Sequence, residues 1–379
     1  MNKLELILLD DDADYVQGVR DYVRARDDGG MIEIKVFSKP DAALAALRQA
    51  HDCGVLLAAE RLWPHGDKGE GPVVLLLESL TDTGRLPTGV HYAFRYLPLD
   101  QLMQTVRRAL TASGNNSRHA FAGKASDGRS RVITWFSAGG GSGKSTAAYN
   151  LAMRLAQQGE DVCLVSLESL PSALWMKREI SPRMAEWLYY AKAKPHTAIE
   201  RIGELIRPGL YRHLYYTDAF AHPDDAADMS AEDAELLLNA LKKSNRFAWI
   251  IVDLEAGWSG RNRGALQGSD RIMWIVTDDA GALHKTEAML ELWRADGVID
   301  KFAGRLSFIA GKYVGLTPTG YDRIGIDPSG VLPYVPQWKM VKHPEELLKA
   351  AFYTQTLWEA FQGIAQVPER SAATWNDPS

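Results

Sequence analysis

Residues 131–160 read RVITWFSAGGGSGKSTAAYNLAMRLAQQGE, and this stretch decides the fold of the larger part of the chain. A β-rich apolar run comes first, a glycine-rich loop follows, and a helical pattern comes last. Glycines let backbone amides turn inward and approach phosphate oxygens closely. The first turn of a helix adds unsatisfied N–H groups at the positive end of its dipole. The segment therefore predicts a strand–loop–helix unit that binds nucleotide phosphates. The alternative is a glycine-rich turn of another βαβ unit, and the Gly-Lys-Ser sequence argues against it.

Side chains of the loop and of one later strand supply the expected chemistry. Lys144 can reach the β- and γ-phosphates of ATP, and the hydroxyl of Ser145 can ligate Mg²⁺. Asp253 closes the apolar run FAWIIVDL, where a carboxylate can order a Mg²⁺-bound water. The alternative for Asp253 is an acid that caps the following turn. The loop residues expected to bind the nucleotide are Gly139, Gly140, Gly141, Ser142, Gly143, Lys144, Ser145 and Thr146.

The remaining sequence predicts two α/β modules. Short apolar runs alternate with helical periodicity in residues 1–112 and again in residues 131–366, which favours two doubly wound parallel sheets. Residues 113–130 are rich in Ser, Gly and Asn, so we expect a flexible linker there. Residues 367–379 are expected to form a disordered tail.

Composition sets limits on the class of protein. With 379 residues, 46% of them hydrophobic and 24% charged, the chain suits two or three soluble domains. A formal net charge of −5 does not favour a nucleic-acid binder. Cys53 and Cys163 both lie in apolar runs and predict reduced core residues of a cytoplasmic protein. No apolar run approaches the roughly 20 residues of a membrane span, so any membrane contact would be peripheral.

The loop departs from the common pattern G-x4-G-K-[ST], because Ala138 stands where that pattern has glycine. It resembles instead the K-G-G-x-G-K-[ST] loop of the MinD/ParA family of P-loop ATPases. Residues 150–152, Asn-Leu-Ala, match the N-L-A that follows in that family. The segment QQGEDVCLVSLE is similar to the family's G-K-x-V-L-L-I-D-x-D, with Glu168 at the second acid and Ser166 at the first. Asp253 matches the acid of the Walker B strand.

The resemblance implies ATP and Mg²⁺ as ligands and an ATP-dependent, face-to-face homodimer. It assigns catalysis to Lys144 and to Glu168, which would orient the attacking water. The family's signature lysine is replaced by Gly139, which removes a cation from the γ-phosphate of the partner subunit. The Asn-Lys pair near the base matches Gly311 and Lys312, so only Lys312 remains as a nucleotide contact. We therefore expect ATP binding with slow hydrolysis, and weak ATPase activity at most.

The first module resembles a response-regulator receiver domain that has lost its chemistry. Residues 10–12, three aspartates after the first strand, match the acidic cluster that binds Mg²⁺ in receivers. Glu60, four residues before Pro64, stands where the family has its phosphoacceptor Asp. Leu97 replaces the family's lysine, and Glu78 falls near the hydroxyl residue. A degenerate docking domain is the preferred interpretation, with Glu60 as a mimic of phosphorylation the alternative. The three aspartates either bind a cation or are simply exposed at the end of the strand.

A pseudo-receiver followed by such an ATPase resembles the TadZ/CpaE family of tight-adherence (Tad/Flp) pilus assembly systems. The resemblance implies a bacterial factor that localises a secretion machine, expected at a cell pole. Its partners would be pilus or secretion proteins, or a polar landmark, bound through the pseudo-receiver.

Two other functions use the same fold. A ParA-like DNA-partition ATPase would need a basic surface, and basic residues occur at Lys242, Lys243, Arg246, Arg261 and Arg263. A MinD-like septum or flagellar-number regulator would carry a C-terminal membrane helix. The final helical pattern, residues 344–365, lacks the Lys and Arg of such an anchor, and we expect it to pack on the ATPase core.

Overall fold

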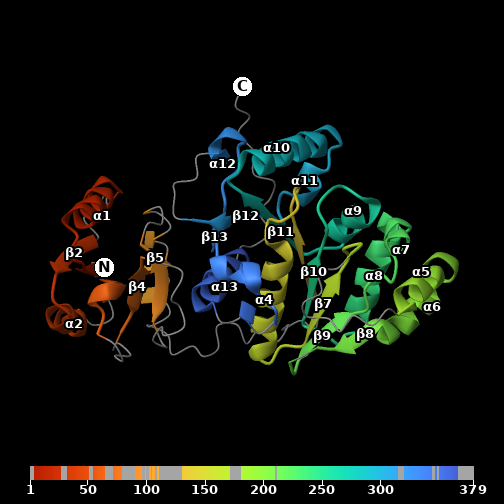
Figure 1. Cartoon of the computed structure of the whole chain (residues 1–379), viewed down its shortest axis with the longest axis horizontal. Helices are drawn as coiled ribbons and strands as arrows, with labels where there is room; N and C mark the ends of the chain where they lie inside the picture. The colour runs from red at the N-terminus through yellow and green to blue at the C-terminus, as the bar shows by residue number, and fades with distance from the viewer. Residues whose placement is uncertain are drawn as a thin grey trace. The chain divides into compact units, whose positions relative to one another are not determined.

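The computed structural model describes most of both modules, and each is considered by itself (Figure 1). The chain divides into two compact units, one built on a five-stranded sheet and the other on an eight-stranded sheet. The described residues are 4–26, 32–50, 54–64, 71–78, 90–95, 99, 102–103, 105–106, 109–110, 130–170, 181–209, 211–314, 320–343, 346–347 and 350–365. The predicted linker, apart from Ser130, and the predicted tail lie outside these ranges.

The first unit is a parallel sheet in the order β2-β1-β3-β4-β5, the flavodoxin-like order. Its strands are β1 (Leu4–Leu9), β2 (Ile32–Phe37), β3 (Gly54–Ala59), β4 (Val73–Leu77) and β5 (His91–Phe94). The accompanying helices are α1 (Ala13–Arg26), α2 (Pro40–Gln49) and the short η2 (Glu60–Leu62). All six residues of β3 are buried, as continuous apolar runs require when helices cover both faces of a sheet. The predicted fold of this module is confirmed.

The second unit is a larger sheet in the order β13-β12-β11-β6-β10-β7-β9-β8. Its strands are β6 (Arg131–Phe136), β7 (Val162–Ser166), β8 (Ile206–Pro208), β9 (Leu214–Thr217), β10 (Trp249–Asp253), β11 (Arg271–Thr277), β12 (Leu306–Tyr313) and β13 (Gly330–Pro333). The pairings are parallel except at the edge, where β8 runs antiparallel to β9. The predicted doubly wound parallel sheet is confirmed. The strand β8 was not predicted, because its three residues carry too little pattern.

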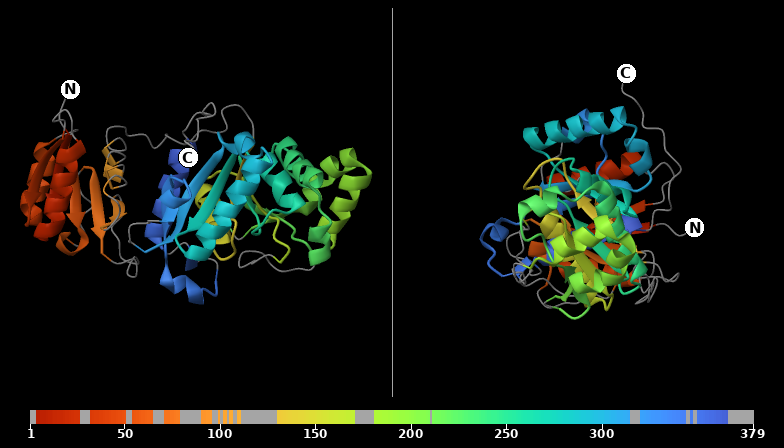
Figure 2. Two further views of the ribbon diagram at one scale, coloured as in Figure 1. Left: turned by 90° about the horizontal axis from the view of Figure 1, so that it is seen from above. Right: turned by 90° about the vertical axis from the view of Figure 1, so that its right-hand side faces the viewer.

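Helices cover both faces of this sheet, as the further views in Figure 2 show. On one face, α4 (Lys144–Gln157) and α13 (Ala351–Ala365) share a core with inward residues of the strands. On the other, Trp293 of α10 (Ala280–Ala295) packs on Phe136 and Trp274, and Phe302 of α11 (Ile299–Phe302) packs on Trp293. The remaining elements are α5 (Arg183–Ala193), α6 (Pro195–Glu200), η4 (Arg201–Leu205), α7 (Pro223–Ala227), α8 (Ala231–Lys243), α9 (Gly260–Gln267), α12 (Gly320–Arg323) and η5 (Pro336–Met340).

The last helix packs on the core, as expected from its sequence. Phe352, Leu357, Phe361 and Ile364 of α13 are buried, and α13 lies beside α4. Its apolar face is therefore already covered by protein. Among the helices of the described ranges, none has the length and apolar character needed to cross a membrane.

Candidate nucleotide site

The phosphate loop joins β6 to α4 and has the backbone conformation that its glycines permit. Gly141 has φ of 71° and Gly143 has φ of 98°, both in the left-handed region that disfavours other residues. Ser142 is buried, and its hydroxyl donates to Ser137 Oγ at 3.0 Å, while Ser137 Oγ donates to the carbonyl of Gly139. These contacts hold the loop from inside, and α4 begins at Lys144 directly after it.

Lys144 is buried at the start of α4, with 6% of its surface exposed. Burial lowers the pKa of its ammonium group, and the carboxylates of Asp253, Glu168 and Glu255 act in the opposite direction. A buried cation surrounded by acids is a costly arrangement unless it serves a ligand. The structure thus brings Lys144, Glu168 and Asp253 together, as the sequence predicted for the site.

Asp253 ends β10 next to the loop and is completely buried. Neither of its carboxylate oxygens has a hydrogen bond of normal geometry among the described residues, although a contact with Ser145 acts to lower the pKa of the carboxyl group. Burial, followed by the negative charge of Glu168, raises the pKa of Asp253 to about 7. Buried polar atoms are nearly always satisfied, so an orphaned carboxylate indicates a missing partner. Ser145 Oγ lies nearby and donates to Glu168 Oε1 at 3.4 Å. A hydroxyl and an unpartnered carboxylate are ligands that suit Mg²⁺, so the residues present fit the metal.

The loop that carries Glu168 is anchored by two residues that sequence reasoning left without a role. Glu255 accepts hydrogen bonds from the amide of Ser169, at 3.1 Å, and from its hydroxyl. Arg261 is paired with Glu255, and its Nε donates to the carbonyl of Leu167 at 2.8 Å. The residues on both sides of Glu168 are therefore tied to the segment after β10. The position of Glu255 at a strand end was the only sequence signal, and many solvated acids share it.

Two glycines explain how the loop meets its neighbours. A Cβ on Gly311, in β12, would stand 2.4 Å from Ile275 Cγ2 and 3.1 Å from the carbonyl oxygen of Ser142. An asparagine at this position would collide with the loop, so glycine follows from close packing. Lys312 is exposed next to it, with φ of 52°. At the other glycine, Gly139, a Cβ would lie 3.6 Å from Cδ of Lys285 in α10.

The three aspartates of the first unit are neutralised by arginines. Asp10 is buried, and Arg95, only 1% exposed, donates to both of its carboxylate oxygens. Arg95 also donates to Asp12 Oδ2 at 2.9 Å, and Arg61 Nη2 donates to Asp10 Oδ1 at 2.9 Å. Arg61 is further paired with Asp11. Guanidinium groups therefore occupy the space between these three carboxylates. Leu97, the residue at the receiver's lysine position, lies outside the described residues.

One of the basic residues considered for DNA contact is buried, and another is paired with an acid. Arg261 is buried, 4% exposed, and donates to the carbonyls of Leu167 and Ala226. Lys242 is paired with Asp270 at 3.3 Å. Arg261 thus serves the interior and does not contribute to a DNA-binding surface. In the part of the chain that the structure describes, no group of three or more His, Cys, Asp or Glu side chains is arranged to hold a metal by itself.

A glycine loop at the end of a central parallel strand, with a lysine opening the next helix, places the protein in the class of P-loop α/β proteins. Comparison with known proteins makes this more specific. No family model matches the chain. It is 26% identical over 169 residues to the septum site-determining protein MinD of Bacillus subtilis (strain 168), covering 44% of this chain and 59% of that protein. Over this stretch the chain is distantly related to MinD proteins. It spans about 60% of the length of the curated relatives it matches.

A solved structure shares the fold of the second unit. A ParA family ATPase from Chlorobium tepidum TLS matches with a TM-score of 0.51 and 18% identity, over 63% of this chain and 99% of that one. The MinD of Pyrococcus horikoshii OT3, solved in complex with Mg-ADP, matches with a TM-score of 0.46 and 16% identity, over 62% and 98%. The MinD-like parallel-sheet fold predicted for the second module is confirmed.

Proposed function

We propose that this protein is a nucleotide-gated switch of the MinD/ParA type, which binds Mg·ATP, dimerises and hydrolyses ATP slowly. The observation that carries the proposal is that Lys144 and Asp253 are both buried beside the phosphate loop, while the carboxylate of Asp253 lacks a hydrogen bond of normal geometry. Each is costly in the folded protein, and a phosphate–Mg²⁺ ligand would satisfy both.

Each residue of the site has a task in this proposal. The amides of residues 139–146 hold the phosphate oxygens, and Lys144 neutralises the β- and γ-phosphates. Ser145 and Asp253 would hold Mg²⁺, which supplies charge neutralisation on the phosphates when bound. Glu168, anchored through its neighbours by Glu255 and Arg261, accepts a hydrogen bond from the water that attacks the γ-phosphate. Lys312 contacts the nucleotide from the end of β12.

Two features support slow hydrolysis. Gly139 carries no cation for the γ-phosphate, and electrostatic stabilisation is the main catalytic factor in phosphoryl transfer. In the ligand-free protein, Glu168 also accepts a hydrogen bond from the hydroxyl of Ser145, which is a proposed ligand of Mg²⁺. The carboxylate is therefore not held for the attacking water alone. A long-lived ATP state suits a switch, because ATP can favour a dimer only by binding it more tightly than the monomer.

The cellular role we propose is localisation of a Tad/Flp-type pilus assembly machine in a bacterial cytoplasm, at a cell pole. The N-terminal unit supports this role, because its receiver-like sheet carries arginines in the acidic cluster and Glu60 in place of the phosphoacceptor. Such a unit suits constant docking to a pilus protein or polar landmark, and it suits phosphorylation poorly.

The test measures nucleotide binding and turnover together. Isothermal titration with ATP and Mg²⁺ is expected to give one site per chain in the wild type and none in Lys144→Ala. Phosphate release is expected below about 10⁻² s⁻¹, the rate of a slow P-loop NTPase. Undiminished binding to Lys144→Ala would refute the assigned site. Fast turnover, abolished in Glu168→Gln, would favour a partition-type enzyme, and salt-sensitive retention of duplex DNA would then support that alternative.

A further inference from the structure

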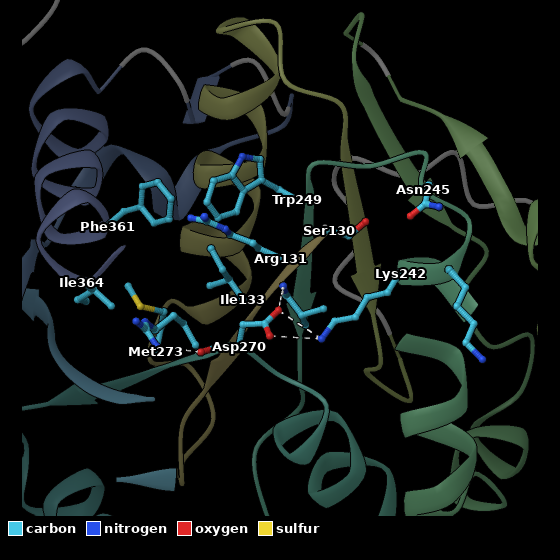
Figure 3. Close-up of a pocket in the computed structure, with 13 residues that line it drawn as sticks. Ser130, Arg131, Ile133, Lys242, Asn245, Trp249, Asp270, Met273, Phe361 and Ile364 are labelled. Atoms are coloured by element: carbon cyan, nitrogen blue, oxygen red, sulfur yellow. Dashed lines mark hydrogen bonds and ion pairs between the residues drawn. The ribbon is translucent and has the colours of Figure 1, made fainter. Parts of the chain in front are cut away.

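A cavity of about 750 Å³ opens at the end of the central strands that lies opposite the phosphate loop, and Figure 3 shows its lining. It lies at the amino ends of β6, β10 and β11, whereas the loop follows the carboxyl end of β6. A strand advances about 3.3 Å per residue, so the six residues of β6 separate the two places by roughly 20 Å. The cavity is therefore a separate site, with a volume in the range of small-molecule pockets.

One wall of the cavity is aromatic and rigid. Trp249 of β10 and Phe361 of α13 pack edge to face, with ring centroids 5.4 Å apart and an interplanar angle of 77°. Ile133 and Ile364 extend the apolar lining in the same view. All four side chains are at least nine-tenths buried, so their neighbours hold them in place and each meets the cavity with a small part of its surface.

The charged lining is unbalanced in favour of cations. Asp270 is the acid among the lining residues, and it accepts a hydrogen bond from the amide of Val132 at 2.7 Å and pairs with Lys242. Its negative charge is therefore already compensated. Arg131 and Lys243 add positive charge and are exposed. The guanidinium carbon of Arg131 lies 5.6 Å from the ring centroid of Trp249, which places a cation at the aromatic wall.

We propose that this cavity binds a small organic anion that carries a flat apolar ring. The ring would lie along Trp249 and Phe361, and the anionic group would pair with Arg131. A neutral aromatic molecule would leave the positive charge uncompensated, and a simple inorganic anion would leave most of the cavity of about 750 Å³ unfilled. A cavity with an aromatic wall and a cation beside it therefore favours a molecule that has both a ring and an anionic group.

The test uses a matched pair of probes on the full chain. Anilinonaphthalene sulfonate has the required anion and rings, and phenylnaphthylamine is its uncharged counterpart. Calorimetric titration is expected to show one saturable site for the sulfonate and much weaker binding of the amine. Arg131→Gln should weaken the sulfonate about tenfold or more, as loss of a charge-assisted contact does. Arg263→Gln, a second exposed arginine of the same unit that does not line the cavity, should leave binding unchanged.

Three results would overturn the proposal. Equal affinities for the sulfonate and the amine would show that charge plays no part. Equal effects of Arg131→Gln and Arg263→Gln would place the probe elsewhere. Displacement of the sulfonate by Mg·ATP in the wild type, but not in Lys144→Ala, would place it in the nucleotide site. Sulfonate binding that survives in Lys144→Ala with unchanged affinity supports a separate cavity, whatever the fate of the proposed switch.

Discussion

At the scale of single residues, the proposed nucleotide site is built at the expense of stability. Asp253 is completely buried without a partner for its carboxylate among the described residues, and Lys144 beside it is desolvated. Buried ionisable groups of this kind are retained where a ligand compensates them. Stability of the free protein and affinity for the ligand should therefore respond in opposite directions when such a group is changed.

Asp253→Asn tests this opposition. The substitution keeps the shape and removes the buried charge, so the free energy of unfolding of the ligand-free protein should rise by about 1–3 kcal/mol. Mg²⁺-dependent ATP affinity should fall at the same time, because a carboxylate ligand is lost. Urea unfolding in a chelator and ATP titration with Mg²⁺ measure the two effects. Asp279→Asn is the control, since Asp279 caps α10 and has hydrogen-bond partners. A fall in both stability and affinity would contradict this account of Asp253.

Lys285 gives a second test at this scale, because its aliphatic chain covers Gly139 in the phosphate loop. Lys285→Ala removes a cation whose side chain lies against that glycine and should weaken ATP binding about threefold to fivefold, the range of an exposed charge. Lys301→Ala in α11, also exposed, is the matched control and should bind ATP like the wild type. Equal affinities of the two variants would remove Lys285 from the site.

At the scale of elements, the sequence predicted the parts whose pattern is local. The strand RVITWF, the glycine loop and the helix from Lys144 follow from apolar periodicity and from glycine conformations within one short stretch. The fold of both sheets was likewise predicted from their buried runs. Contacts made by residues far apart in sequence could not be predicted, such as Arg95 with Asp10 or Arg261 with Leu167. A strand of three residues, β8, carries too little pattern to detect.

Asp10 and Arg95 directly follow β1 and β5, and their contact gives a prediction about the stability of the first unit. Arg95→Leu leaves Asp10 buried and without its bidentate partner, so we expect a loss of about 3–5 kcal/mol in the unfolding of that unit. Millimolar Mg²⁺ should restore part of the loss in the variant, because the vacated space is lined by carboxylates, and should not stabilise the wild-type unit. Thermal unfolding with and without Mg²⁺ measures this. Lys35→Ala, which breaks the partly exposed pair with Glu5, should cost less than about 1 kcal/mol. If Mg²⁺ stabilised the wild-type unit as much as the Arg95→Leu variant, the arginines would not be the groups that neutralise the three aspartates.

At the scale of the whole molecule, two α/β units share one chain and differ in what their acidic clusters do. In the first unit, internal arginines compensate the acids, and the cluster has no need of a ligand. In the second unit, according to our proposal, Asp253 and Lys144 are compensated when nucleotide and Mg²⁺ bind. This contrast supports a division of tasks, with constant docking by the first unit and nucleotide-dependent association by the second.

The measurement that tests this most directly is size-exclusion chromatography with light scattering, with and without saturating Mg·ATP, on the wild type and Lys144→Ala. Phosphate release is followed in the same samples. We predict a wild-type dimer that depends on ATP, that Lys144→Ala abolishes, and that persists while little phosphate is released. A dimer fraction that does not change when ATP saturates the site would contradict the nucleotide-gated switch.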